Sequence, residues 1–332
     1  MNNSNIKNPA PIAFFVYKRP DHTKRTLEAL AANDLAADSD LFIFSDGPKD
    51  DGAYAGVRQV RELIRTAKDF RSVTITEHET NQGLSKSLIA GITELCDRFG
   101  RVIVVEDDIL TSSNFLRFMN EGLDKYKNNN EVFSICGFWP SKYRQGDDKA
   151  FFIKTQSCWG WATWKRAWDF YDYHAPGWEK LLKDKRIAWD FDLRGRYNFT
   201  SMLLRQVKYD IETWDIQWYW AIFARNGLNL FPPYSLTTNI GFDDLSTHKS
   251  AGSAWIIQNI DLSIGNIPIV MPDHCDADKE KHENHAEFIY IGLHDRYKSR
   301  WSIKSLFWFL YRPLRFIEMV LPFGIRLGVW KR

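Results

Sequence analysis

The chain has 332 residues, which is enough for a complete α/β domain with additional elements attached to it. Its 44 Lys and Arg nearly balance its 42 Asp and Glu, so no overall field favours nucleic acid or a strongly acidic partner. The four cysteines form no Cys-x-x-Cys pair, which argues against a disulfide framework or a zinc site. The polar N-terminus lacks a signal-peptide pattern and no apolar run spans a bilayer, so we expect a cytoplasmic protein.

The first half of the chain alternates apolar, β-rich runs with helical patterns, the runs lying at 12–17, 41–45, 72–76 and 101–105. This alternation predicts an α/β fold with a mostly parallel, doubly wound (Rossmann-like) sheet flanked by helices. In open sheets of this kind, ligands bind beyond the carboxyl ends of the strands. The polar loops that follow these four runs are therefore the expected place for a site.

The second half is less regular. Further strands are predicted at 132–139 and 150–154, and the pattern from 164 to 225 is mostly helical and rich in Trp, Tyr and charged residues. The chain contains 14 Trp, and their flat faces suit sugar rings, although packing in a core is the commoner use of any single indole. We interpret 164–225 as a helical, Trp-rich region on the acceptor side of a site.

The last stretch, 301–332, mixes aromatic, aliphatic and basic side chains and is too charged to span a bilayer. Two interpretations remain open. The segment either lies in the inner face of the cell membrane as an amphipathic helix or packs on the domain. In the first case we expect a peripheral membrane protein with a lipid-linked acceptor.

The sharpest motif is the apolar strand that runs directly into Glu106, Asp107 and Asp108. Three adjacent carboxylates repel one another, and their position at the end of a buried strand is costly unless a cation is bound there. Mg²⁺ or Mn²⁺ prefers oxygen ligands and keeps positions open for water and phosphate, so one or two of these acids suffice to hold it. The alternative is an exposed acidic turn.

Polar residues after the other strands are candidates for nucleotide contacts. Arg19 precedes Pro20, a residue suited to the first position of a helix, so its guanidinium can face the crevice; a surface arginine is the alternative. Asp46 follows the second strand, where it can accept from a base ring N–H or simply form a turn. Asn81 and Gly83 open a helix and allow a ligand to approach the backbone closely.

Two aromatic segments complete the set. In 158–168, Gly160 lies between two indoles, and we expect this segment, with Trp161, either to fold over a ligand or to plug the core. Asp215 begins the helical segment 214–220 among indoles that exclude water and raise its basicity, which makes it the candidate catalytic base. The alternative role for Asp215 is that of a helix cap.

Taken together and in this order, these segments resemble GT-A glycosyltransferases, in particular bacterial relatives of the N-acetylglucosaminyltransferase I family, whose metal motif is an EDD variant of DxD. The resemblance covers about 10–250. It is carried by FVYKRP at 15–20, FSDG at 44–47, NQGL at 81–84, VVEDDI at 104–109, CWGWATW at 158–164, WDIQW at 214–218 and the DLSTH that ends at His248. One departure is that Ile216 and Gln217 follow Asp215 where the family spaces its second acid and closing Trp differently.

The resemblance implies a role for each of these positions. Asp108 would bind Mn²⁺ or Mg²⁺ directly, with Glu106 and Asp107 near the ribose and the donor sugar. Arg19 would contact the nucleotide and Asp46 the uracil. His248 would lie in a loop over the diphosphate, within reach of the phosphate or the metal.

We therefore expect a metal-dependent, inverting glycosyltransferase that moves a sugar from a nucleotide diphosphate donor, a UDP-sugar, to a glycan or lipid-linked glycan in bacterial surface polysaccharide or glycoconjugate synthesis. The catalytic domain would span 1–250, with a nucleotide-sugar half at about 10–130 and an acceptor half at about 131–250, followed by a C-terminal extension at 251–332. No nucleic-acid partner is expected. The alternatives are a nucleotidyltransferase and a non-catalytic carbohydrate-binding or scaffold protein with the same fold.

Overall fold

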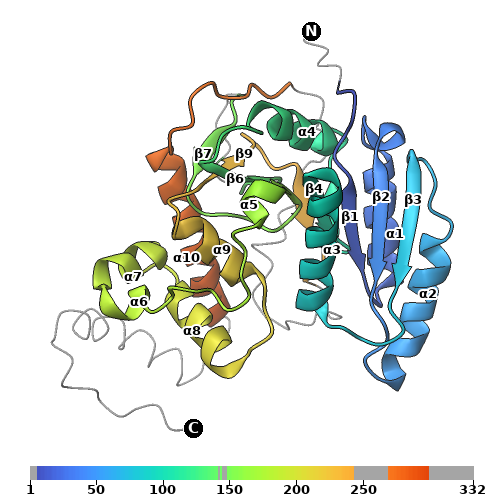
Figure 1. Cartoon of the computed structure of the whole chain (residues 1–332), viewed down its shortest axis with the longest axis horizontal. Coiled ribbons are helices and arrows are strands. Elements are labelled where there is room, and N and C mark those ends of the chain that lie inside the picture. The colour runs from blue at the N-terminus through green and yellow to red at the C-terminus, as the bar shows by residue number, and fades with distance from the viewer. Residues whose placement is uncertain (1–5, 141–142, 144–147, 243–267, 299–332) are drawn as a thin grey trace.

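The computed structural model describes residues 6–140, 143, 148–242 and 268–298 (Figure 1). The strands in this part of the chain are β1 (Ile12–Val16), β2 (Asp40–Ser45), β3 (Ser72–Glu77), β4 (Arg101–Glu106), β5 (Ile109–Thr111), β6 (Val132–Cys136), β7 (Phe151–Ile153), β8 (Trp161–Trp164), β9 (Leu228–Phe231) and β10 (Thr237–Asn239). The α-helices are α1 (Pro20–Ala31), α2 (Tyr54–Ile64), α3 (Leu84–Phe99), α4 (Phe115–Lys125), α5 (Lys165–Trp168), α6 (Lys180–Lys183), α7 (Lys185–Phe191), α8 (Phe199–Tyr209), α9 (Asp215–Phe223) and α10 (Lys279–Lys298). Short 3₁₀ turns lie at Ala36–Asp38 and Asp51–Ala53.

Eight of the strands form one sheet in the order β3-β2-β1-β4-β8-β6-β9-β7, and β5 pairs with β10 in a small second sheet. The first four strands of the large sheet are parallel, with β1 between β2 and β4. Their polar C-terminal ends therefore meet at one edge. The predicted α/β class, with a mostly parallel sheet flanked by helices, is confirmed.

Helices cover both faces of the sheet because its central strands are apolar on both sides. On one face, side chains of α1, α2 and α4 pack against alternate residues of β1, such as Phe14, and of β4, such as Ile103. On the other face, α3, α5 and α9 pack against the intervening residues, such as Phe15 and Val104. This three-layer arrangement fixes the strand ends on which the candidate site is built (Figure 1).

The Trp-rich region divides between the sheet and a helical lobe. As predicted, 164–225 is mostly helical, and α7, α8 and α9 share a separate apolar cluster around Phe191 and Tyr219. Strand β8 lies antiparallel between β4 and β6 in the middle of the sheet and is not among the strands predicted from the sequence. This strand joins the parallel half to the mixed half that carries the lobe.

Residues 268–298 pack on the edge of the large sheet. Lys149 pairs with Val270 and Phe152 with Ala277 through isolated β-bridges. On α10, His285 and Phe288 are buried, and Phe288 lies 5.8 Å from Phe138 between ring centroids. This part of the C-terminal extension is therefore continuous with the packed body, whereas 299–332, the segment considered for membrane contact, lies outside the described residues. Within the part of the chain that is described, no helix has the length and apolar character needed to cross a bilayer.

Candidate active site

The acidic triplet lies where β4 leaves the sheet. Glu106 is the last residue of this strand, beside Phe15 of β1, and Asp107 and Asp108 form the turn that leads into β5. The turn is held by backbone contacts: the Thr26 hydroxyl donates to the Asp107 carbonyl at 2.8 Å, and the Ile240 N–H donates to the Asp108 carbonyl at 2.9 Å. The carboxylates are thus fixed at the carboxyl edge of the parallel strands.

Arg19 binds two of the three acids. Its Nη2 lies 2.8 Å from Asp107 Oδ1 and 2.7 Å from Asp108 Oδ2. Arg19 is held at this place because it immediately precedes α1, and that helix begins at Pro20 as predicted. The structure therefore brings together Arg19, Asp107 and Asp108 from loops that are far apart in sequence.

Burial and mutual repulsion perturb the acids. Burial raises the pKa of Glu106 well above its ordinary value, and the charges of Asp108 and Asp107 act in the same direction. Burial also raises the pKa of Asp107, to about 6, against the opposing effect of Arg19. For Arg19 burial lowers the pKa, but the two carboxylates outweigh it and raise the pKa above its ordinary value. Burial and the neighbouring acids therefore disfavour ionisation of Glu106 and Asp107, and one guanidinium only partly offsets this effect.

The chain that follows β10 closes over this pair of acids. Gly241 is so close to Asp108 that a Cβ on it would lie 2.0 Å from Oδ2 and 3.1 Å from Arg19 Nη1. The Gly241 N–H donates to Asn239 Oδ1 at 2.7 Å, and a ring nitrogen of His22 lies 3.2 Å from the Ile240 carbonyl. Neither Gly241 nor His22 is marked as a site residue by the sequence, because only the tertiary fold brings 240–241 to the end of β4.

Asp46 has a different role from the one predicted. Its Oδ1 accepts from the N–H groups of Gly47 and Gln82, both at 2.8 Å. Its Oδ2 accepts from Asn81 Nδ2 at 2.9 Å and from the Gly83 N–H at 3.0 Å. A carboxylate has about four acceptor sites, so these bonds use its capacity. The prediction that Asp46 accepts from a base is therefore corrected: the residue joins two loops.

Asn81 and Gly83 lie in the loop after β3, which Asp46 joins to the loop after β2. Asn81 also donates to the Gly47 carbonyl at 2.8 Å. Gly83 precedes α3, as predicted, with φ of +82°, a conformation that favours glycine. A Cβ there would also meet Glu212 Oε1 at 2.3 Å, so this glycine permits close packing of the loop against the segment before α9.

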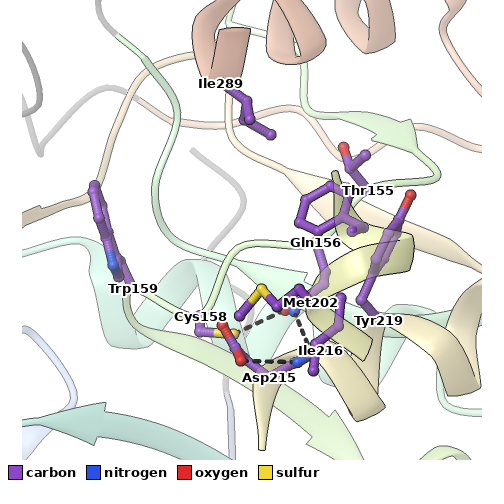
Figure 2. A pocket seen from close by; sticks show the side chains of 10 residues that line it. Thr155, Gln156, Cys158, Trp159, Met202, Asp215, Ile216, Tyr219 and Ile289 are labelled. Atoms are coloured by element: carbon purple, nitrogen blue, oxygen red, sulfur yellow. Dashed lines mark hydrogen bonds between the residues drawn. The ribbon is translucent and has the colours of Figure 1, made fainter. Parts of the chain in front are cut away.

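Asp215 begins α9 and faces a cavity of about 150 Å³ (Figure 2). Its Oδ1 accepts from the Thr213 hydroxyl at 2.5 Å and from the Ile216 N–H at 2.8 Å. Among the described residues, no hydrogen bond reaches Oδ2. Trp214 is the N-cap of α9, so Asp215 is the first residue of the helix and not its cap, and its role as a catalytic base stays a prediction.

The rest of the cavity is a mixture of apolar and polar side chains. It is lined by Thr155, Gln156, Cys158, Trp159, Phe199, Met202, Asp215, Ile216, Tyr219 and Ile289. Gln156 Nε2 donates to the Asp215 carbonyl at 3.3 Å, and Cys158 Sγ donates to Gln156 Oε1 at 3.1 Å. Ile289 comes from α10, so this helix contributes a side chain to the lining of the cavity (Figure 2).

Trp161 does not line this cavity, which corrects the prediction that it contacts a ligand. It begins β8, is 1% exposed and stacks on Trp214 with ring centroids 5.6 Å apart. Gly160, with φ of +72°, turns the chain just before the strand, and the half-buried Trp159 on its other side lines the cavity instead. Recognising 161–164 as a strand would have placed Trp161 in the core.

The donor set can be compared with what a divalent cation needs. Among the described residues, no group of three or more His, Cys, Asp or Glu side chains is arranged to hold a metal ion. Asp107 Oδ2, however, is buried without a hydrogen-bond partner in this part of the chain, and the Asp108 side chain is 16% exposed. One or two carboxylates with water and phosphate satisfy Mg²⁺ or Mn²⁺, so the residues present fit such an ion. His248 lies outside the described residues.

Comparisons with known proteins add the following. No protein-family model and no curated protein matches the chain. Solved structures with some likeness include the mannosyltransferase PcManGT from Pyrobaculum calidifontis in complex with GDP-Man and Mn²⁺ (13% identity, TM-score 0.32, covering 47% of this chain and 46% of that one). Others are S. aureus TarS (13%, 0.33, 49% and 30%) and mouse xyloside xylosyltransferase 1 in its apo form (10%, 0.36, 65% and 81%). The chain thus spans less than half the length of the first two.

Proposed function

We propose that this chain is a glycosyltransferase that moves a sugar from a nucleotide diphosphate donor to an acceptor hydroxyl, with Asp215 as the base. The donor is a UDP-sugar and the acceptor a glycan or a lipid-linked glycan. This proposal extends to a cytoplasmic location and to a role in surface glycan or glycoconjugate synthesis.

The observation that carries the proposal is that the acid at the start of α9 lies within electrostatic range of the acids at the end of β4. The charge of Asp215 contributes to the raised pKa of Glu106, after burial and the two neighbouring acids. The nucleotide half and the Trp-rich half therefore each bring an acid to one region of the molecule. A displacement needs both parts, an anionic leaving group held on one side and a base for the incoming hydroxyl on the other.

Two features of Asp215 support its role as a base. Thr213 and the Ile216 N–H hold Oδ1, which orients the carboxylate. Oδ2 is left to take the proton of a hydroxyl that enters the cavity beside Trp159 and Tyr219. A cavity of about 150 Å³ holds several water molecules, so a hydroxyl-bearing group fits there. A single base and direct attack lead to inversion at the sugar carbon.

The acids at the end of β4 would act on the leaving group. Asp108, with Asp107 behind it, would hold Mn²⁺ or Mg²⁺, which supplies Lewis-acid stabilisation of the diphosphate. Arg19 donates hydrogen bonds to anionic oxygens at the same place. The loops joined by Asp46 and Asn81 would present their backbone to the nucleotide base, since the Asp46 carboxylate is already occupied.

The test is the release of UDP from a panel of UDP-sugars by the full chain, with Mn²⁺ or with EDTA. We expect one donor to be hydrolysed slowly without acceptor, and EDTA or Asp108→Ala to abolish this. Asp215→Asn keeps an oxygen for the Thr213 and Ile216 contacts. It should retain donor binding by calorimetry and lose transfer by about 10²–10⁴-fold once an acceptor is identified.

Other outcomes separate the alternatives. Incorporation of a nucleotide rather than a sugar into product would indicate a nucleotidyltransferase. Binding of glycans without turnover of any nucleotide sugar, in a protein whose circular dichroism shows it folded, would support the binding or scaffold protein. Either result would remove the catalytic role from Asp215.

A further inference from the structure

The guanidinium of Arg19 binds the two carboxylates that would hold a divalent cation. Its Nη2 is shared between Asp107 Oδ1 and Asp108 Oδ2, at 2.8 and 2.7 Å. Gly241 packs against this contact from the side of β10, and the Arg19 side chain is only 20% exposed. The Arg19 side chain is therefore packed into the acidic site and is not an exposed surface arginine.

The same oxygens are those that a metal ion requires. Mg²⁺ binds carboxylate oxygens at about 2.0–2.1 Å, so an ion on Asp108 Oδ2 and a guanidinium nitrogen on that oxygen would lie close together and repel one another. The buried Asp107 Oδ2, without a partner among the described residues, shows that Arg19 does not satisfy the acids completely. This oxygen is therefore an acceptor that a further ligand can use.

We propose, on the basis of the function proposed above, that Arg19 competes with the divalent cation for Asp107 and Asp108 in the free protein and gives way to it when the nucleotide diphosphate binds. The residue is thus a positioning device that couples metal binding to donor binding. Without a donor, the metal meets acids that are already paired.

The guanidinium of Arg19 has hydrogen-bond donors with which it could bind the nucleotide diphosphate instead of the acids. A guanidinium has five N–H donors, and the two hydrogen bonds of Arg19 to the acids both use Nη2. Among the described residues, no hydrogen bond involves its Nε or Nη1. These donors match the oxygens of a diphosphate, so an arriving donor offers Arg19 new anionic partners as it releases the acids to the metal.

Coupling of this kind is reciprocal. If the nucleotide raises the affinity for Mn²⁺ by a certain factor, Mn²⁺ raises the affinity for the nucleotide by the same factor. Replacing Arg19 should therefore have two effects. Mn²⁺ alone should bind more tightly, and the addition of UDP should raise the Mn²⁺ affinity by a smaller factor.

The experiment measures Mn²⁺ binding to the full chain by electron paramagnetic resonance of the free ion, with and without UDP. We expect Arg19→Met to bind Mn²⁺ without UDP about tenfold more tightly than wild type, because a cation next to the ligands is lost. UDP should strengthen Mn²⁺ binding in wild type by a larger factor than in the variant. Calorimetric titration of UDP at zero and saturating Mn²⁺ gives the same factor independently.

Two further variants serve as controls. Arg71→Met removes another arginine that binds a carboxylate, Asp40, at the opposite end of β2, and it should leave Mn²⁺ binding unchanged. Arg19→Lys keeps the charge but loses the planar fork, and it should give a Mn²⁺ affinity between wild type and Arg19→Met. This variant also tests the inference if Arg19→Met does not fold.

The inference is overturned if UDP binds in the presence of Mn²⁺ while the affinity for free Mn²⁺ is the same, or weaker, in both Arg19 variants. In that case the proposed function stands and only the competition is wrong. If neither UDP nor any UDP-sugar binds to folded wild type at any Mn²⁺ concentration, the proposed function fails and the inference fails with it.

Discussion

The three acids of the triplet have three different environments. Glu106 ends a strand and is partly exposed, Asp107 is 6% exposed, and Asp108 is partly exposed and lies against Gly241. Asp108 is thus held between Arg19 and the backbone of Gly241, and its role as the direct metal ligand stays a prediction.

Gly241→Ala tests how closely the backbone after β10 confines this carboxylate. The new Cβ would lie 2.0 Å from Asp108 Oδ2, so Asp108 or the 240–241 segment must move. We expect UDP binding in the presence of Mn²⁺ to weaken by about tenfold, since a displaced ligand loses metal contact. Gly52→Ala is the matched control, because its Cβ would meet only Asp50 Oδ1, at 3.4 Å. Equal affinities of the two variants would contradict this packing.

Among the elements, α10 links the C-terminal part of the chain to the acceptor side of the site. His285 bonds to the Thr155 hydroxyl at 2.8 Å and stacks on Trp139, while Ile289 lines the cavity. Side chains of the segment 155–159 line the same cavity. The helix therefore supports the loop that carries Trp159, although nothing in its own sequence marks it as part of a site.

Phe288→Ala tests this support. Phe288 is 8% exposed and contacts Phe138, so its truncation removes buried apolar surface between α10 and the loop after β6. We expect the free energy of unfolding to fall by about 3 kcal/mol in urea titrations. Asn284→Ala, on the same helix and only partly buried, should change it by less than about 0.5 kcal/mol. A similar small loss for both variants would mean that the helix adds little to the fold.

For the whole molecule, the three layers enclose thiols that the chemistry does not use. Burial raises the pKa of Cys96, beside the charges of Asp169 and Asp97, and that of Cys136, each to about 12. In an unfolded chain a thiol ionises near its ordinary pKa of 9.0. Above that pH the folded protein holds more protons than the unfolded one, so stability falls as pH rises.

Urea unfolding at about pH 8 and about pH 10 measures this effect. Each of the two thiols should cost about 1.4 kcal/mol of stability per pH unit once the pH exceeds 9.0 and until it nears 12. The double variant Cys96→Ala, Cys136→Ala should therefore lose less stability than wild type over the same interval. Parallel declines in the two proteins would show that other groups, such as the buried tyrosines, dominate.

The layers of the fold and its acidic edge can be predicted from the sequence. Local patterns of apolar residues predict β1 to β4 and the helices between them, and a strand that ends in three acids marks its own C-terminal end. The start of α1 at Pro20, of α3 after Gly83 and of α9 at Asp215 are likewise local signals, because a helix start depends on a few neighbouring residues.

Which side chains meet depends on the tertiary structure. Asp46 resembles a residue with a free carboxylate until Asn81 and Gly83 are brought to it from the next strand. Trp159 and Trp161 look equivalent until pairing of 161–164 with β4 and β6 puts one in the core. Gly241 reaches Asp108 across more than a hundred residues. Such contacts depend on long-range packing, which no local pattern of residue types encodes.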